Sequence, residues 1–245
     1  MPSHDGETEI IMRLDRFLAE CGFGTRSEVK KLIRTGAVSI NGEQAKKADL
    51  SVDTDSDRVT VSGSCVQYKK YVYLMLNKPN GYISATRDGR LPTVLSLVPD
   101  EYRHFSLHPV GRLDIDTEGL LILTNDGGLS HRLLSPRSHV PKKYLAELDR
   151  KPDSSDISAF AEGVTLDDGY HTLPAELQPR DGCFAEVTIH EGKFHQVKRM
   201  FEAVGKKVVY LKRIKMNALP LDESLSKGEM RELTETELEL LRGKL

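Results

Sequence analysis

The most informative stretch of this chain is Gly111–Leu121, which reads GRLDIDTEGLL. It places an arginine and two aspartates among turn-forming residues, directly before the apolar run Leu120–Thr124. The apolar run predicts a buried strand, and the end of a strand is a rigid place to hold a reacting side chain. At least one of these crowded carboxylates is therefore expected to have a perturbed environment. The alternative is a polar turn before a strand, because turns favour the same residue types.

The same stretch resembles the motif of the pseudouridine synthases, in the branch of single-chain enzymes that modify ribosomal RNA. That family keeps Gly-Arg-Leu-Asp followed by Thr-x-Gly-Leu, and all of these residues occur here. The resemblance implies that Asp114 is the one essential catalytic residue. It also implies that Arg112 occupies the space left by a flipped nucleotide, where a guanidinium can stack and hydrogen-bond. Asp116 lies outside the catalytic position and is interpreted as a local acceptor that shapes the turn.

Length and composition set broad limits on the chain. Its 245 residues allow one large domain, or a small and a medium one. The formal net charge of −2 gives no argument for or against a nucleic-acid partner. No apolar run is long enough to span a bilayer, and no signal-peptide pattern occurs. Three dispersed cysteines without a Cys-x-x-Cys spacing argue against a disulfide framework or a zinc site, so the expected location is the cytoplasm.

The N-terminal part predicts a disordered polar tail at residues 1–11 and a small unit at residues 12–63. Apolar residues at helical spacing predict two helices in this unit, and Thr25–Glu28 has the form of a capping box that starts the second. The unit resembles the alpha-L RNA-binding motif, which implies docking on structured RNA mainly through phosphates. The alternative is an ordinary solvated helix surface. The basic residues expected to contact RNA are Arg13, Arg16, Arg26, Lys30, Lys31 and Arg34.

The remainder of the chain is expected to consist of a linker at residues 64–70 and a catalytic domain at residues 71–245. Strand patterns outnumber helical patterns and do not alternate regularly with them. This predicts an α+β fold with a mixed or antiparallel sheet. Strands are expected at 71–76, 119–125, 143–148, 184–189 and 208–211, and helices at 128–134, 155–161, 193–203 and from 234 onward.

A second segment of the family's pattern is the Lys-x-Tyr that Lys142 and Tyr144 match. The resemblance implies that the tyrosine ring stacks on the target base, and a flipped pyrimidine needs such an aromatic or apolar platform. The alternative is a tyrosine that simply packs within a strand.

The third segment is Glu191–Phe201, EGKFHQVKRMF, which matches the family's third motif. The resemblance implies that Lys198 pairs with Asp114 and that Val197 is the apolar contact of the uracil. Arg199 is the second candidate for the ion pair. An opposite charge nearby keeps a buried carboxylate ionised, as a nucleophile or base requires.

Charge is also uneven around this motif. Eight lysines and arginines but only one acid, Glu202, occur from Lys193 to Lys215, which predicts a nucleic-acid groove unless the face is merely solvated. The residues Phe194, His195 and Lys198 resemble the small-subunit enzymes more than the large-subunit ones. The five-residue spacing from His190 to His195 does not suit metal ligands on one helical face, so no metal is expected. The resemblance implies an isomerisation, so no cofactor is expected either.

The sequence therefore predicts an isomerase that breaks the N-glycosidic bond of one uridine in 16S rRNA, rotates the base and rejoins it through carbon. The expected partner is 16S rRNA, free or in a pre-ribosomal small-subunit particle, and the expected state is a monomer. Two alternatives stay open: a target in 23S rRNA, and a non-catalytic rRNA-binding assembly factor. The segment Lys215–Pro220 departs from the family because it lacks the glycine pattern expected there, which bears on local RNA contacts.

Overall fold

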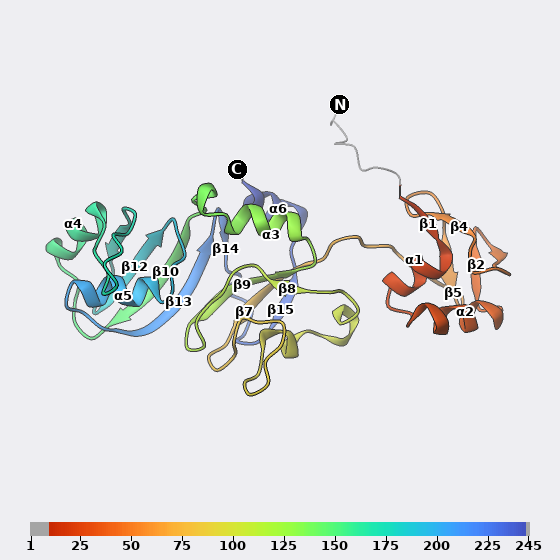
Figure 1. The fold of residues 1–245 in the computed structure, drawn as a ribbon, viewed down its shortest axis with the longest axis horizontal. Coiled ribbons are helices and arrows are strands. Elements are labelled where there is room, and N and C mark those ends of the chain that lie inside the picture. The colour runs from red at the N-terminus through yellow and green to blue at the C-terminus, as the bar shows by residue number, and fades with distance from the viewer. Residues whose placement is uncertain (1–9, 244–245) are drawn as a thin grey trace, which may run out of the picture. The chain divides into compact units, whose positions relative to one another are not determined.

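The computed structural model describes residues 10–243, which divide into two compact units (Figure 1). The first is Met1–Lys70 with Pro99–Phe105, and the second is Tyr71–Val98 with Ser106–Leu245. Within the described range, no helix is both long enough and apolar enough to cross a membrane.

The first unit combines two helices with two small sheets. Thr25 caps the second helix as predicted, because its hydroxyl accepts from the Glu28 N–H and the Glu28 side chain accepts from the Thr25 N–H. The apolar faces of the two helices pack on the strands in one core that includes Phe17 and Val29. Its elements are β1 (Ile11–Arg13), α1 (Leu14–Glu20), α2 (Arg26–Arg34), β2 (Val38–Ile40), β3 (Glu43–Gln44), β4 (Ser51–Asp53), β5 (Val59–Val61) and β6 (Ser64–Cys65).

Two details of this unit concern the predictions. Asn41 and Gly42 both take positive φ, 52° and 86°, as the predicted tight hairpin turn between β2 and β3 requires. The predicted tail of residues 1–11 is different. Its first nine residues lie outside the described residues, whereas Ile11 already belongs to β1, which pairs antiparallel with β4. The strand also delays the first helix, which begins at Leu14 and not at Met12.

The second unit is built on a mixed sheet, which confirms the predicted α+β class. Within its described residues, nine strands form one sheet, with the main path β11-β12-β10-β13-β9-β7-β15. All of these pairs are antiparallel except β13 with β9. The strands are β7 (Tyr73–Lys78), β8 (His108–Pro109), β9 (Glu118–Thr124), β10 (Lys142–Leu148), β11 (Glu176–Pro179), β12 (Phe184–Ile189), β13 (Val208–Met216), β14 (Leu219–Pro220) and β15 (Met230–Glu232).

The parallel contact between β13 and β9 is short and joins the two halves of the sheet. It consists of Lys212 opposite Glu118 and Arg213 opposite Gly119. Gly119 has φ of 98°, and a Cβ atom there would lie 2.3 Å from the Arg213 carbonyl oxygen. Only glycine therefore allows this close approach of the two backbones.

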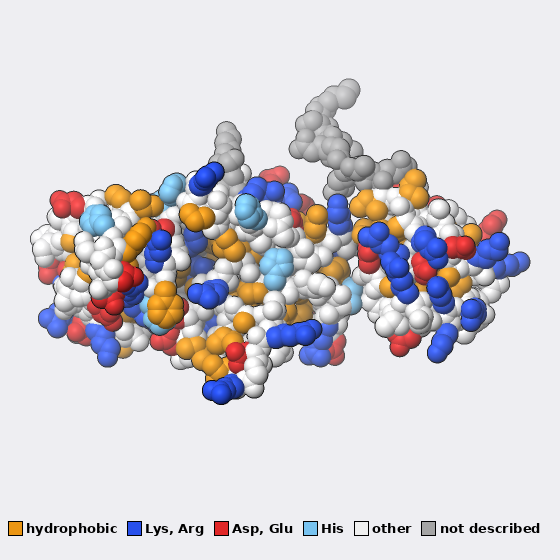
Figure 2. Space-filling model, in the orientation of Figure 1, with side chains coloured by type: hydrophobic (Ala, Val, Ile, Leu, Met, Phe, Trp, Pro, Cys, Tyr) orange, Lys and Arg blue, Asp and Glu red, His pale blue; other side chains and the backbone are white. Residues whose placement is uncertain are grey.

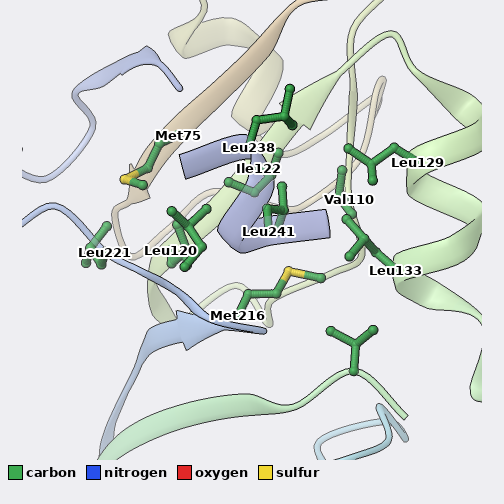
Figure 3. Packing of buried hydrophobic residues seen from close by; sticks show 12 residues of the cluster. Met75, Val110, Leu120, Ile122, Leu129, Leu133, Met216, Leu221, Leu238 and Leu241 are labelled. Atoms are coloured by element: carbon green, nitrogen blue, oxygen red, sulfur yellow. The ribbon is translucent and has the colours of Figure 1, made fainter. Parts of the chain in front are cut away.

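Four helices belong to this unit within the described residues: α3 (Gly127–Leu134), α4 (Ser154–Glu162), α5 (Gln196–Ala203) and α6 (Glu235–Arg242). Figure 3 shows Leu238 and Leu241 of α6 lying beside Leu120 and Ile122 of β9, in a core that also includes residues of α3. The predicted caps of α3 and α6 are both present, at Asp126 and Thr234.

Element boundaries differ from the predictions at three places that matter for the site. Strand β7 runs two residues further than expected, so Lys78 belongs to the strand and not to a turn. Helix α5 begins at Gln196 and not near Lys193, because the residue before it, His195, takes a left-handed conformation (φ 48°). Strand β13 extends to Met216, which brings Arg213 into the sheet.

Candidate active site

A cleft of about 510 Å³ opens in the second unit, at the join between β9 and β13. One wall is the loop Gly111–Thr117 that leads into β9, and another is the segment Glu191–Val197 that leads into α5. The floor is formed by residues of one face of the sheet. The cleft therefore brings together all three segments that the family motifs singled out.

The loop that carries Asp114 is fixed from below by β7 and the turn after it. The buried Lys78 ammonium donates to the carbonyl oxygens of Asp114 at 3.1 Å and Thr117 at 2.8 Å. The Ser84 hydroxyl both donates to the Leu113 carbonyl and accepts from the Leu113 N–H, each at 3.0 Å. The main chain at Asp114 is thus held in place by Lys78 of β7 and by Ser84, which follows that strand. A preorganised site requires such support from other parts of the fold.

The carboxylate of Asp114 lies between two side chains of the α5 segment. Lys198 Nζ is 3.5 Å from Oδ2, and His195 Nε2 is 3.6 Å from Oδ1. The side chain keeps a quarter of its surface exposed to the cleft. The structure thus brings Asp114 and Lys198 within ion-pair distance, as the resemblance implied.

Lys198 has a second and nearer partner in Asp116, whose Oδ1 lies 2.6 Å from Nζ. Burial alone would raise the pKa of Asp116, but the hydrogen bond and the charge of Lys198 outweigh it and hold the pKa below its ordinary value. Asp116 therefore does more than shape the turn. Its carboxylate and that of Asp114 both pair with Lys198, the only lysine within the described residues that contacts the Asp114 carboxylate.

His195 owes its position to an uncommon backbone conformation. A non-glycine residue rarely adopts φ of 48°, and here that conformation ends the loop and starts α5. The imidazole stacks on Phe194, with ring centroids 3.7 Å apart, and faces Asp114. Glu191 holds the loop from the other side by accepting from Gln196 Nε2 at 2.7 Å and from Tyr170 Oη at 2.7 Å.

The floor of the cleft includes both residues of the Lys-x-Tyr pattern. Tyr144 and Lys142 are two residues apart on β10 and both line the cleft, as the alternation of side chains along a strand dictates. Tyr144 is 7% exposed. Burial and then the charge of Arg213 lower the pKa of Lys142 to about 8. Val197, the predicted apolar contact, lines the cleft from α5.

The two remaining arginines of the prediction have different surroundings. Arg112 is exposed, lines the cleft and makes no hydrogen bond or ion pair with another described residue. Arg199 is not among the cleft residues, because its guanidinium pairs with Asp168 at 2.7 Å and with Asp167. Arg199 is thus held away from Asp114, and the structure does not bring this second candidate into the ion pair.

The six basic residues predicted on the first unit are all exposed, and Lys and Arg side chains cover its α1–α2 face in Figure 2. Two of them are paired, Arg13 with Asp15 at 3.0 Å and Arg16 with Glu20 at 2.6 Å. The four on α2 make no ion pair within residues 10–243. They are Arg26, Lys30, Lys31 and Arg34.

No group of three or more histidine, cysteine, aspartate and glutamate residues within the described range is arranged to hold a metal ion. The expectation that the protein works without a metal or cofactor remains a prediction.

Comparison with known proteins identifies the family of the chain. A family model described as RNA pseudouridylate synthase matches residues 72–203, and an S4-domain model matches residues 12–59. The chain belongs to the RNA pseudouridylate synthase family. Members of this family are isomerases, and the prediction of an isomerase with an N-terminal RNA-binding module is confirmed.

Relatives match nearly the whole chain. An uncharacterized RNA pseudouridine synthase of Bacillus subtilis is 51% identical over 94% of this chain and 98% of its own length. The ribosomal small subunit pseudouridine synthase A of Haemophilus influenzae is 42% identical over 94% and 99%, and that of Escherichia coli is 41% identical over 93% and 98%. A crystal structure of a pseudouridylate synthase superposes with a TM-score of 0.67 at 41% identity, covering 94% of this chain and 99% of that chain.

Three residues in or beside this cleft were not named as site residues from the sequence. Lys78 follows Asn77 at the end of β7, and Arg213 lies between Lys212 and Ile214 on β13, so the local sequence does not mark either cation as buried. Glu191 opens the motif Glu191–Phe201, but its own role was not predicted, because its partners Gln196 and Tyr170 meet it only in the folded chain.

Proposed function

We propose that this chain converts one uridine of small-subunit rRNA to pseudouridine, with Asp114 as the essential carboxylate. The observation that carries the proposal is the environment of that carboxylate. It faces the cleft between Lys198 and His195, and Tyr144 lies on the floor of the same cleft. A cation beside a carboxylate favours the anion, which both a nucleophile and a base must be.

Other cleft residues have natural roles in extracting and holding a base. Arg112 is exposed at the edge of the cleft and has no partner among residues 10–243, so its guanidinium is available to fill the gap in the RNA. Tyr144 and Val197 offer an aromatic and an apolar surface to a pyrimidine ring. Lys142 is suited to an RNA phosphate near the target.

The first unit would supply affinity without base recognition. The four basic residues of α2 have no acidic partner within the described residues, so their charges are available to phosphates. A face of this kind suits structured RNA, whose phosphates and shape are read more readily than its paired bases.

Small-subunit rRNA is the favoured substrate because two relatives that match nearly the whole chain are named ribosomal small subunit pseudouridine synthase A. The residues Phe194, His195 and Lys198 agree with that choice. A 23S rRNA target is the alternative within the class. A non-catalytic assembly factor is disfavoured, because such a protein has no need of a clamped Asp114 loop.

The test is pseudouridine mapping by carbodiimide-dependent primer-extension stops on 16S and 23S rRNA from cells that lack this protein. The cells are re-supplied with the wild type or with Asp114→Asn. We expect one 16S stop to vanish in the deletion and to return only with the wild type. A site lost from 23S rRNA would move the substrate to the large subunit, and rescue by Asp114→Asn would remove the catalytic assignment.

A further inference from the structure

Arg213 is a buried charged residue of the cleft that the site described so far does not use. It is 1% exposed, lies in the middle of β13 and lines the cleft. Its Nε donates to the Leu120 carbonyl at 2.7 Å. Its Nη2 is fully buried and, among the described residues, has no hydrogen-bond partner.

An orphan donor of this kind is unusual in a protein interior. Buried polar groups are nearly always hydrogen-bonded, and an unpaired buried charge is costly. No carboxylate of the described residues lies within ion-pair distance of this guanidinium, although acids pair with Lys198, Arg199 and Lys206 in the same unit. The site therefore keeps one desolvated cationic donor without a protein acceptor.

Arg213 lies next to Tyr144, the residue proposed to stack on the target base. Arg213 and Tyr144 are opposite each other in the antiparallel pairing of β13 and β10, so their side chains leave the same face of the sheet. Residues opposite each other have Cβ atoms about 5 Å apart. A donor on Arg213 is thus beside the edge of any ring that stacks on Tyr144. Lys142, two residues before Tyr144 on β10, also lines the cleft, and the charge of Arg213 helps to lower its pKa to about 8.

We propose that the Arg213 guanidinium, which lines the cleft, donates to a carbonyl oxygen of the target uracil and stabilises the negative charge that the base acquires during isomerisation. This inference rests on the proposed function. When the C1′–N1 bond breaks, its electron pair stays with the base and spreads onto O2 and O4. After rotation C5 bonds to C1′, the proton on C5 is lost and N1 gains one, so no atom is added or removed.

The physical reason for such a donor is that charge develops only in the reacting state. A fixed cation in a buried site interacts more strongly with that charge than water would, and it needs no reorientation. The uncharged uracil of the bound substrate gains less from the same contact. Loss of Arg213 should therefore slow the chemical step more than it weakens RNA binding.

The experiment compares Arg213→Met and Arg213→Lys with the wild type in the full chain. Lys212→Met is the matched control, because Lys212 is the neighbouring cation on β13 and does not line the cleft. Thermal unfolding establishes that each variant is folded. Single-turnover pseudouridine formation at saturating RNA, and the Kd for the same RNA, are then measured. We expect Arg213→Met to lose about 100- to 1,000-fold in rate, Arg213→Lys to lose less, and RNA affinity to change less than about threefold in both.

A second measurement uses RNA with 2-thiouridine or 4-thiouridine at the target. Sulfur changes the acceptor that Arg213 is proposed to contact. The rate effect of one thio substitution should therefore differ at least about threefold between the wild type and a folded Arg213 variant. If Arg213→Met does not fold, the thio effects are compared between the wild type and Arg213→Lys alone.

Three results would overturn the inference. The first is that folded Arg213→Met forms pseudouridine at the wild-type rate. The second is that 2-thiouridine and 4-thiouridine each change the rate equally in the wild type and in the Arg213 variant. The third is that the variant is impaired only in its Kd for RNA, with a weaker dependence of Kd on salt. The last would make Arg213 a phosphate contact. An inactive wild type would instead remove the proposed function, and this inference with it. An active wild type beside an equally active Arg213→Met removes the inference alone.

Discussion

Lys78 Nζ donates to the main-chain carbonyl of Asp114 at 3.1 Å, from a residue 36 positions earlier in the chain. The same ammonium reaches the carbonyls of Pro79, Ile115 and Thr117 at 2.8–3.3 Å. Burial lowers the pKa of Lys78 to about 8, so the group is mostly protonated at neutral pH. One buried cation thereby holds the backbone at the proposed catalytic residue and just after it.

Replacement of Lys78 by methionine should damage stability and activity together. The substitution keeps the length of the side chain but leaves buried carbonyl oxygens without a donor, at a cost of about 2–4 kcal/mol. Chemical denaturation should show that loss. Single-turnover rates should fall about 100-fold in the fraction that stays folded, since the loop no longer holds Asp114 in place. Unchanged stability and rate would mean that the loop does not depend on Lys78.

Substitution of Asp116 should show which of the two carboxylates that pair with Lys198 the reaction requires. In Asp116→Asn, Lys198 keeps Asp114 as a partner, so we expect the single-turnover rate to stay within about tenfold of the wild type. In Asp114→Asn the same assay should give no product. An equal and complete loss in both variants would make the pair, and not Asp114 alone, the reacting unit.

Gly119→Ala should disrupt the join between the two halves of the sheet. The new Cβ would meet the Arg213 carbonyl oxygen at 2.3 Å, in a backbone with φ of 98°, so we expect a loss of about 2–5 kcal/mol in the free energy of unfolding. Gly89→Ala is the control, because a Cβ there has no atom within 4 Å. Similar unfolding midpoints for the two variants would contradict the prediction.

RNA binding should weaken at alkaline pH through Lys142. Its pKa of about 8 means that its charge is lost as pH rises from 7 to 9, and we expect Kd for the target RNA to rise about five- to tenfold. In Lys142→Arg the cation does not titrate in this range, so the rise should be smaller. A pH dependence of Kd that is the same in both proteins would exclude Lys142 as its source.

The stability effect of Lys142 has the opposite sign. The folded-state pKa lies below the ordinary value of 10.5, so the unfolded chain binds more protons between about pH 8 and 10.5. The contribution of Lys142 to the free energy of unfolding therefore rises over that range. Urea unfolding at pH 8 and pH 10 should show a smaller gain in stability for Lys142→Met than for the wild type.

Local signals were enough to predict many elements of the fold. The capping boxes at Thr25 and Thr234 and the cap at Asp126 depend on residues three positions apart, and all three were predicted correctly. Strand β1 was missed because it is defined by its pairing with β4, forty residues later. The left-handed conformation of His195 was also missed, since its cost is offset only by contacts in the folded site.

The site was harder to predict where charges find partners across the chain. The basic run after Lys193 suggested an open groove, yet Lys206 is buried against Asp153 and Asp156, and Arg199 is paired with two aspartates. Acids far away in the sequence thus neutralise part of that run. By contrast, the missing glycine near Lys215–Pro220 has a local explanation, because Asn217 takes the positive φ of 51°, which asparagine tolerates.

The most direct test of the account is a reaction of the purified protein with unmodified 16S and 23S rRNA, and with a small-subunit particle that contains the former. Pseudouridine is then mapped at each uridine for the wild type and for Asp114→Asn. The account predicts one modified uridine in 16S rRNA, none in 23S rRNA, and no product from the variant. Product formed by Asp114→Asn at the wild-type rate would contradict it.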